Sequence, residues 1–153
     1  MAVKSIDDEH HVVRHCKKRL LIRQAGKIVS VYPAAFHLRP ATEGFAKEDS
    51  LSVIYYEFFD GTAEVRIKEC CAALTLKVRP KDGLIRLNVG LIKEQGRKRE
   101  RRLRVTHEPE PTCPAYAAIR GLPEKADDEL STLIANLAIV EALEASAVMG
   151  DIQ

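Results

Sequence analysis

Alternating apolar and polar positions dominate the first part of the chain and predict β-strands. Residues 11–16 and 28–31 place β-branched side chains among polar ones, which is the period of a half-buried strand. Residues 24–26 predict the turn between them. Residues 51–59 are aromatic and β-branched, and we expect a buried strand that turns at its end. Residues 35–38 precede an Arg-Pro pair and predict a short extended segment.

Apolar residues at spacings of three and four predict two longer helices. Thr62 suits the N-cap of the first, which should run for about four turns as far as Val78. Asp127 or Asp128 suits the N-cap of the second, whose stripe extends to Val140. Together with the strands, these helices should bury a core that includes Ile67, Leu74, Leu87, Val89, Leu103, Val105, Leu133 and Leu137.

The chain between these helices predicts a β-hairpin and a short third helix. Residues 84–90 form one expected strand, residues 95–96 a charged turn, and residues 103–107 the strand that returns. Pro114 and Gly121 suit the two ends of a short helix over residues 115–120.

Length and composition favour one α+β domain over residues 1–153, with a flexible start over residues 1–9. A chain of 153 residues with 46% hydrophobic and 30% charged residues is long and apolar enough for a core, which excludes a disordered chain. We expect a mixed or antiparallel sheet with about three helices. No repeat or linker divides the chain.

Several features favour a cytoplasmic protein that does not enter a membrane. The first ten residues hold acids and no apolar run of signal-peptide length. No segment approaches the ~20 apolar residues of a membrane-spanning helix. The four cysteines show no Cys-x-x-Cys pair, so we expect reduced thiols that pack as small apolar side chains.

Seven short motifs occur in a fixed order along most of the chain. They are HVVR at 11–14, AFHLRP at 35–40, LSV at 51–53, EFF at 57–59, LNVG at 87–90, HEP at 107–109 and AIRGLP at 118–123. In this order they resemble a family of small bacterial hypothetical proteins. The resemblance implies a bacterial source and assigns no activity. Such relatives tend to have Asn-Trp where this chain has Ile54-Tyr55, and Ser-His where it has Ala115-Tyr116.

The histidines do not predict a metal site, and no cofactor motif is present. His10, His11 and His15 cluster early in the chain, but no spacing of His and Cys matches a known zinc site. The chain also lacks the glycine patterns that hold a phosphate or a dinucleotide. We expect neither a bound metal nor a cofactor.

One set of polar residues is compatible with an enzyme that acts on a nucleotide or RNA. His11, Arg14, Glu57 and His107 lie on or beside predicted strands. They resemble the ADP-ribosyltransferase-like fold, which includes RNA 2′-phosphotransferases, where His and Arg hold phosphate or ribose and Glu orients a ribose hydroxyl. The alternative is structural, with Arg14 paired to Glu57 or Glu108.

The strongest charge feature is a basic segment on the predicted hairpin. Seven cations stand there against two acids, whereas the whole chain carries only +2; the cations are Lys93, Arg97, Lys98, Arg99, Arg101, Arg102 and Arg104. Such a segment favours binding to nucleic acid or to an acidic protein. Two alternatives remain open: a solvated hairpin that resists edge aggregation, and a structural subunit whose last helix packs on another chain. Whether the protein is an enzyme, and whether it self-associates, also stays open.

Overall fold

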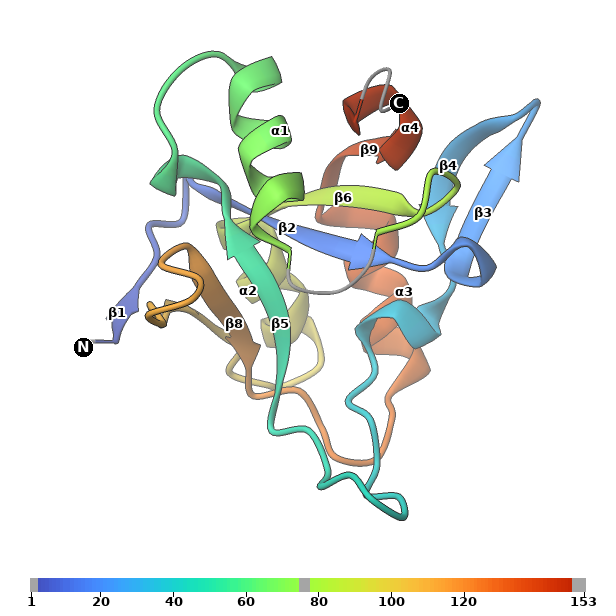
Figure 1. Ribbon diagram of the computed structural model, residues 1–153. Helices are drawn as coiled ribbons and strands as arrows, with labels where there is room; N and C mark the ends of the chain where they lie inside the picture. The colour runs from blue at the N-terminus through green and yellow to red at the C-terminus, as the bar shows by residue number, and fades with distance from the viewer. Residues whose placement is uncertain (1–2, 75–77, 150–153) are drawn as a thin grey trace.

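A seven-stranded antiparallel sheet forms the centre of the protein (Figure 1). The computed structural model describes residues 3–74 and 78–149. The strands lie in the order β1-β7-β8-β5-β2-β6-β9, and β3 and β4 form a separate hairpin. Their bounds are β1 Lys4–Ser5, β2 His11–Cys16, β3 Leu21–Gln24, β4 Lys27–Val31, β5 Ser50–Tyr55, β6 Gly83–Asn88, β7 Arg104–His107, β8 Tyr116–Arg120 and β9 Ile139–Glu144.

Helices cover both faces of this sheet. The described residues form four α-helices: α1 Ala63–Ala73, α2 Val89–Lys98, α3 Asp128–Leu137 and α4 Ala145–Met149. Three short 3₁₀ turns are η1 Lys18–Leu20, η2 Pro33–Phe36 and η3 Tyr56–Phe58. The predicted α+β class is therefore confirmed, with an antiparallel sheet and one more helix than expected.

Neighbouring residues of β2 belong to two different cores. Val12 is fully buried among side chains that include Ile92 of α2 and Ile134 of α3. Val13 is fully buried on the opposite face with Ile67 of α1. Successive side chains of a strand point to opposite faces, so α2 and α3 form one layer and α1 and α4 the other (Figure 1). Because β2 has a core on each face, both of its neighbouring valines, Val12 and Val13, are buried.

Most of the predicted core is confirmed. Ile67, Leu87, Val89, Leu103 and Val105 are buried. Leu74 and Leu133 are only half-buried, and the prediction for Leu137 is wrong, since that side chain is 46% exposed. The reason is that α3 ends at Leu137, so the expected stripe does not continue to Val140, which lies in β9.

The predicted hairpin over residues 84–107 is wrong. Its first strand is β6, but the chain then forms α2, and β6 and β7 are not neighbours in the sheet. Asn88 starts the helix, because its side-chain oxygen accepts a hydrogen bond from the Leu91 N–H at 2.9 Å. Gly96 lies inside α2 rather than in a turn.

Three smaller predictions are also corrected. Residues 116–120 form β8 between β5 and β7, not a helix. Residues 35–36 belong to η2, not to an extended segment. The helix capped by Thr62 ends at Ala73 and is shorter than four turns; part of its expected continuation, residues 75–77, lies outside the described residues. The start of the chain, expected to be flexible, contributes β1, which pairs with β7.

Candidate nucleic-acid interface

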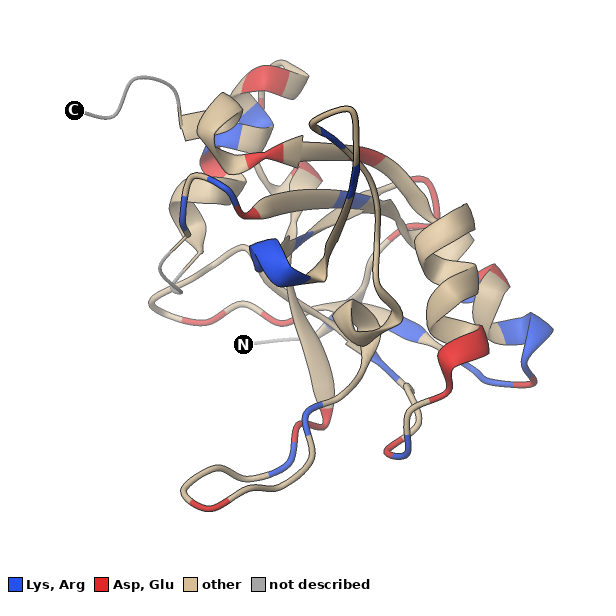
Figure 2. Cartoon of the chain, turned by 90° about the vertical axis from the view of Figure 1, so that its right-hand side faces the viewer, with Lys and Arg blue, Asp and Glu red and all other residues tan. Residues whose placement is uncertain are grey.

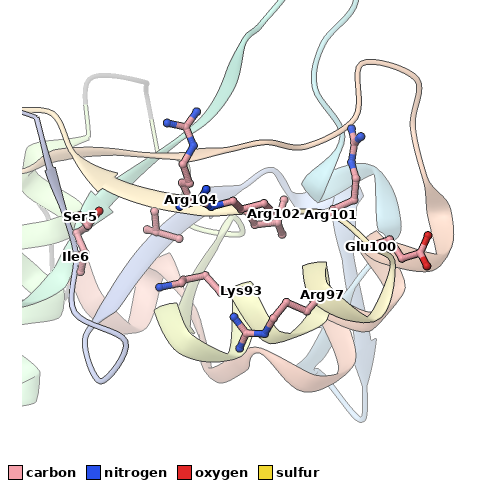
Figure 3. A pocket seen from close by; sticks show the side chains of 10 residues that line it. Ser5, Ile6, Lys93, Arg97, Glu100, Arg101, Arg102 and Arg104 are labelled. Atoms are coloured by element: carbon pink, nitrogen blue, oxygen red, sulfur yellow. The ribbon is translucent and has the colours of Figure 1, made fainter.

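The basic segment borders a groove of about 560 Å³ between α2 and the chain that leads into β7 (Figure 3). Ser5 and Ile6 of the β1 region close one side. Ten residues line the groove: Ser5, Ile6, Lys93, Arg97, Glu100, Arg101, Arg102, Leu103, Arg104 and Val105. Five of the ten are cations and only Glu100 is an acid, so the groove concentrates positive charge.

Periodicity on both walls places the cations at the groove. Lys93 and Arg97 are one helical turn apart and therefore share a face of α2. On the opposite wall, Arg102 and Arg104 are exposed while Leu103 between them is buried. The apolar side chain anchors this wall to the core, and its charged neighbours stay in solvent.

Gly96 allows the two walls to approach each other. A Cβ atom at this position would lie 2.6 Å from Cγ of Leu103 and 2.9 Å from the carbonyl oxygen of Arg101. Real Cβ atoms do not approach other atoms so closely. The glycine therefore serves close packing between α2 and the segment before β7, rather than a turn.

All four arginines that line the groove lack an ion pair with the described residues. Lys93 forms an ion pair with Asp8 at 2.6 Å. Within residues 3–74 and 78–149, Arg97, Arg102 and Arg104 form no ion pair. Arg101 has none there either, and its Nε atom is buried without a hydrogen-bond partner. The positive charge of the groove is therefore largely uncompensated.

Arg99 differs from the other cations of the segment, because it joins α2 to α3. Its Nε lies 3.2 Å from Asp127 and its Nη1 lies 2.9 Å from Glu129. Asp127 also caps α3 by accepting from the Leu130 N–H, and this hydrogen bond together with Arg99 lowers the pKa of Asp127. In Figure 2 the acidic start of α3 lies beside the basic end of α2. Arg99 thus links two helices, and its expected part in binding stays a prediction.

Lys98 is exposed but does not line the groove. The structure therefore brings five of the seven predicted cations to one groove and leaves two outside it.

Across the sheet from Arg104, a second arginine is tightly paired. The register places Arg104 directly opposite Arg120 of β8. Arg120 donates two hydrogen bonds to Glu108, at 2.6 and 2.7 Å. This bidentate contact lowers the pKa of the Glu108 carboxyl. The sequence does not predict the pairing of Arg120 with Glu108, since they are twelve positions apart and no helical or strand period relates them.

Two of the four proposed catalytic residues are in direct contact. Nδ1 of His11 lies 2.6 Å from Glu57, which also accepts a hydrogen bond from the His11 backbone N–H at 2.7 Å. His107 lies nearby in the fold, with its ring 5.2 Å from that of Tyr55. Nε2 of His107 lies 2.7 Å from the Pro114 carbonyl oxygen.

Sequence reasoning missed two members of this cluster. His10 lies 2.6 Å from the hydroxyl of Tyr55, whose pKa is raised by burial and by the charges of Glu57 and Asp7. No spacing in the sequence relates His10 to Tyr55, because they meet only where the start of β2 passes the end of β5.

Arg14 does not join this cluster. It donates to the backbone oxygens of Ala35 and Ser52, at 3.3 and 3.0 Å, and lines a different cavity of about 290 Å³. None of the cavities described here contains more than one of the four proposed catalytic residues. The expected pairing of Arg14 with Glu57 or Glu108 is not formed, because those acids contact His11 and Arg120.

Metal and thiol chemistry find no geometric support in the described part of the chain. No three His, Cys, Asp or Glu side chains of that part lie close enough to hold a metal ion together. Burial raises the pKa of Cys16 to about 11 and that of Cys70 to about 12, so both thiols stay protonated near neutral pH. None of the described helices has the length and apolar character needed to cross a membrane.

Comparison with known proteins returns no match to a family model, a curated protein or a solved structure. Function is therefore inferred from the chemistry of the site.

Proposed function

We propose that the protein binds the phosphate backbone of nucleic acid through the groove between α2 and β7. The observation that carries this proposal is the set of four arginines at the groove that have no acidic partner among the described residues, namely Arg97, Arg101, Arg102 and Arg104. Like charges held close together repel one another, and an anionic ligand relieves that repulsion.

The residue types of the groove favour phosphate over other anions. Four of its five cations are arginines, whose planar guanidinium groups bind phosphate oxygens in pairs. The groove runs between a helix and an extended segment, and cations lie on both of its sides (Figure 3), so a strand placed in it would have cations on each side. No aromatic side chain lines it, so bases have no ring to stack on. Binding should therefore depend little on sequence.

The test is the salt dependence of binding to a fluorescent oligonucleotide, measured by anisotropy for RNA and DNA. The variant combines Arg97→Ala, Arg102→Ala and Arg104→Ala, which are exposed and free of ion pairs in the described chain. Each phosphate contact releases condensed counterions, so log K should fall with log salt, and the variant should reduce this slope by about 2–3.

A matched control removes the same charge elsewhere. Lys27, Lys47 and Lys68 are exposed cations outside the groove. Their triple change to alanine should leave the slope almost unchanged. Equal losses in both triple variants would show attraction by net charge only. Absence of salt-dependent binding to either nucleic acid would overturn the proposal and favour an acidic protein as partner.

A further inference from the structure

A second basic cavity, separate from the groove, lies where β2 meets the chain that enters β6. Its volume is about 820 Å³, within the range of small-molecule sites. It shares no lining residue with the groove. Nine residues line it: His15, Lys17, Lys18, Arg19, Leu21, Tyr32, Arg79, Lys81 and Asp82. In Figure 2 the η1 turn, which contributes part of this lining, is marked blue by its basic residues.

Asp82 holds the two basic loops of this cavity together. It is only 4% exposed and accepts hydrogen bonds from the backbone N–H groups of Lys18 and Arg79, at 3.1 and 3.0 Å. Nε2 of His15 lies 2.8 Å from the same carboxylate. Burial alone raises the pKa of Asp82, but these hydrogen bonds outweigh that effect and lower it. The carboxylate is thus fully engaged within the protein.

The cations around Asp82 are not similarly engaged. Five Lys and Arg residues line the cavity, and of these Lys81 has its Nζ 3.8 Å from Oε1 of Glu144. Lys17, Lys18, Arg19 and Arg79 form no side-chain ion pair with any other described residue. Because Asp82 fixes both loops by their backbone, the loops present their cations from two sides of one cavity.

The cavity also offers an aromatic ring, which the groove lacks. Tyr32 is 50% exposed and its side chain makes no hydrogen bond within the described chain, while Leu21 adds a buried apolar surface beside it. A large aromatic side chain left half in solvent beside free cations suits a ligand with one planar and one anionic part.

We propose that this cavity binds a nucleoside phosphate, with the base on Tyr32 and the phosphate among Lys17, Lys18 and Arg79. Free adenosine 5′-monophosphate presents both parts in one small molecule. This site and the groove do not depend on each other, because they have no residue in common.

The test is isothermal titration of the full chain with adenosine 5′-monophosphate, adenosine and inorganic phosphate. The monophosphate should bind at least about tenfold more tightly than either of the other two, since only it uses both the ring and the cations. Equal affinity for inorganic phosphate would overturn the role of Tyr32. Equal affinity for adenosine would overturn the role of the cations, and absence of saturable binding would overturn the site.

Matched variants assign the two halves of the site. Tyr32→Ala should weaken the monophosphate by about tenfold, whereas Tyr32→Phe should keep its affinity within about twofold, because stacking needs the ring and not the hydroxyl. The pair Lys17→Gln with Lys18→Gln should weaken it similarly, whereas Lys27→Gln with Lys68→Gln should not. Unchanged affinity in folded Tyr32→Ala protein would contradict the proposal.

The groove variant Arg97→Ala, Arg102→Ala and Arg104→Ala should bind the monophosphate normally. This separates failure of the second site from failure of the groove. Loss of monophosphate binding in the groove variant would show that the nucleotide occupies the groove, and would overturn the separate site.

Discussion

Arg104 and Arg120 face each other across β7 and β8, yet their surroundings differ. Arg120 donates two hydrogen bonds to Glu108, whereas Arg104 forms no ion pair in the described chain. Like charges directly opposite on a sheet are destabilising, and Glu108 accepts hydrogen bonds from only one of the two. The same residue type thus serves the fold on one strand and remains available to a ligand on the next.

The same contrast between paired and unpaired charge is found elsewhere in the molecule. Asp82 and Glu108 are acids whose oxygens are taken up by donors of the protein. The groove has the opposite arrangement, with many donors and one acid. Changes in the paired regions should therefore alter stability, and changes in the groove should alter binding.

The largest effect should come from Asp82→Ala. The change leaves His15 and two backbone N–H groups without their acceptor in a site where the carboxyl side chain is 6% exposed. Loss of one partner from such a buried cluster costs about 3–5 kcal/mol of unfolding free energy. Urea unfolding followed by circular dichroism measures it. Asp60→Ala removes an exposed carboxylate and should change stability by less than about 0.5 kcal/mol; similar losses in both variants would contradict the special role of Asp82.

Glu108→Gln should have the next largest effect and should also change the response to acid. The variant weakens the contact with Arg120 and should cost about 1–3 kcal/mol near neutral pH. The folded-state pKa of Glu108 is lowered, so its stabilisation is present above its unfolded-state pKa and is lost as pH falls through the folded-state value. Unfolding free energies measured between neutral and acidic pH should therefore converge for wild type and variant. A gap that persists at the acidic end would contradict the assigned charge pairing.

The smallest effect on stability should come from Arg104→Ala, and its comparison with the separate variant Arg120→Ala is the sharpest test of the contrast. Arg104→Ala should change unfolding free energy by less than about 0.5 kcal/mol and reduce the salt slope of oligonucleotide binding by about 1. Arg120→Ala should do the reverse, with a clear loss of stability and an unchanged slope. Thermal unfolding measures the change in stability, and fluorescence anisotropy on the same samples measures the change in the salt slope of oligonucleotide binding. If both arginines affected the same property, the division between paired and free charge would be wrong.

Local patterns were sufficient for elements whose ends are marked by single residues. The N-caps Thr62 and Asp127 accept the hydrogen bonds expected of them, and residues 11–16 form the expected strand, although its burial does not alternate because Val12 and Val13 are both buried. The patterns failed where a local preference competed with tertiary contacts. Pro114 and Gly121 resemble the two ends of a helix, yet the residues between them pair with strands on both sides.

Gly96 led to the other main error. A glycine between charged residues resembles a hairpin turn, but here it lies in a helix that begins at the Asn88 cap. A glycine is needed at position 96 because the side chain of Leu103, seven residues further along the chain, packs where a Cβ atom would lie. Contacts of this kind are not visible in local periodicity.

For the candidate site, charge was predictable and pairing was not. The cations of the groove are evident from the sequence, since a dense run of Lys and Arg needs no structure to be seen. Which of them are free depends on distant acids. Arg99 meets Asp127, which is 28 residues further along the chain, and His11 meets Glu57 forty-six residues on. Such partners follow from topology rather than from spacing.

The close packing at Gly96 means that a residue without charge sets the separation between two rows of charge. Lys93 and Arg97 stand on one side of it, and Arg102 and Arg104 on the other. The absence of a Cβ atom at Gly96 lets the two rows approach each other and thus sets the width of the groove. Replacing the surface cations changes how strongly the groove attracts an anion. The residue at position 96 instead determines how wide an anion can be and still contact both rows of cations.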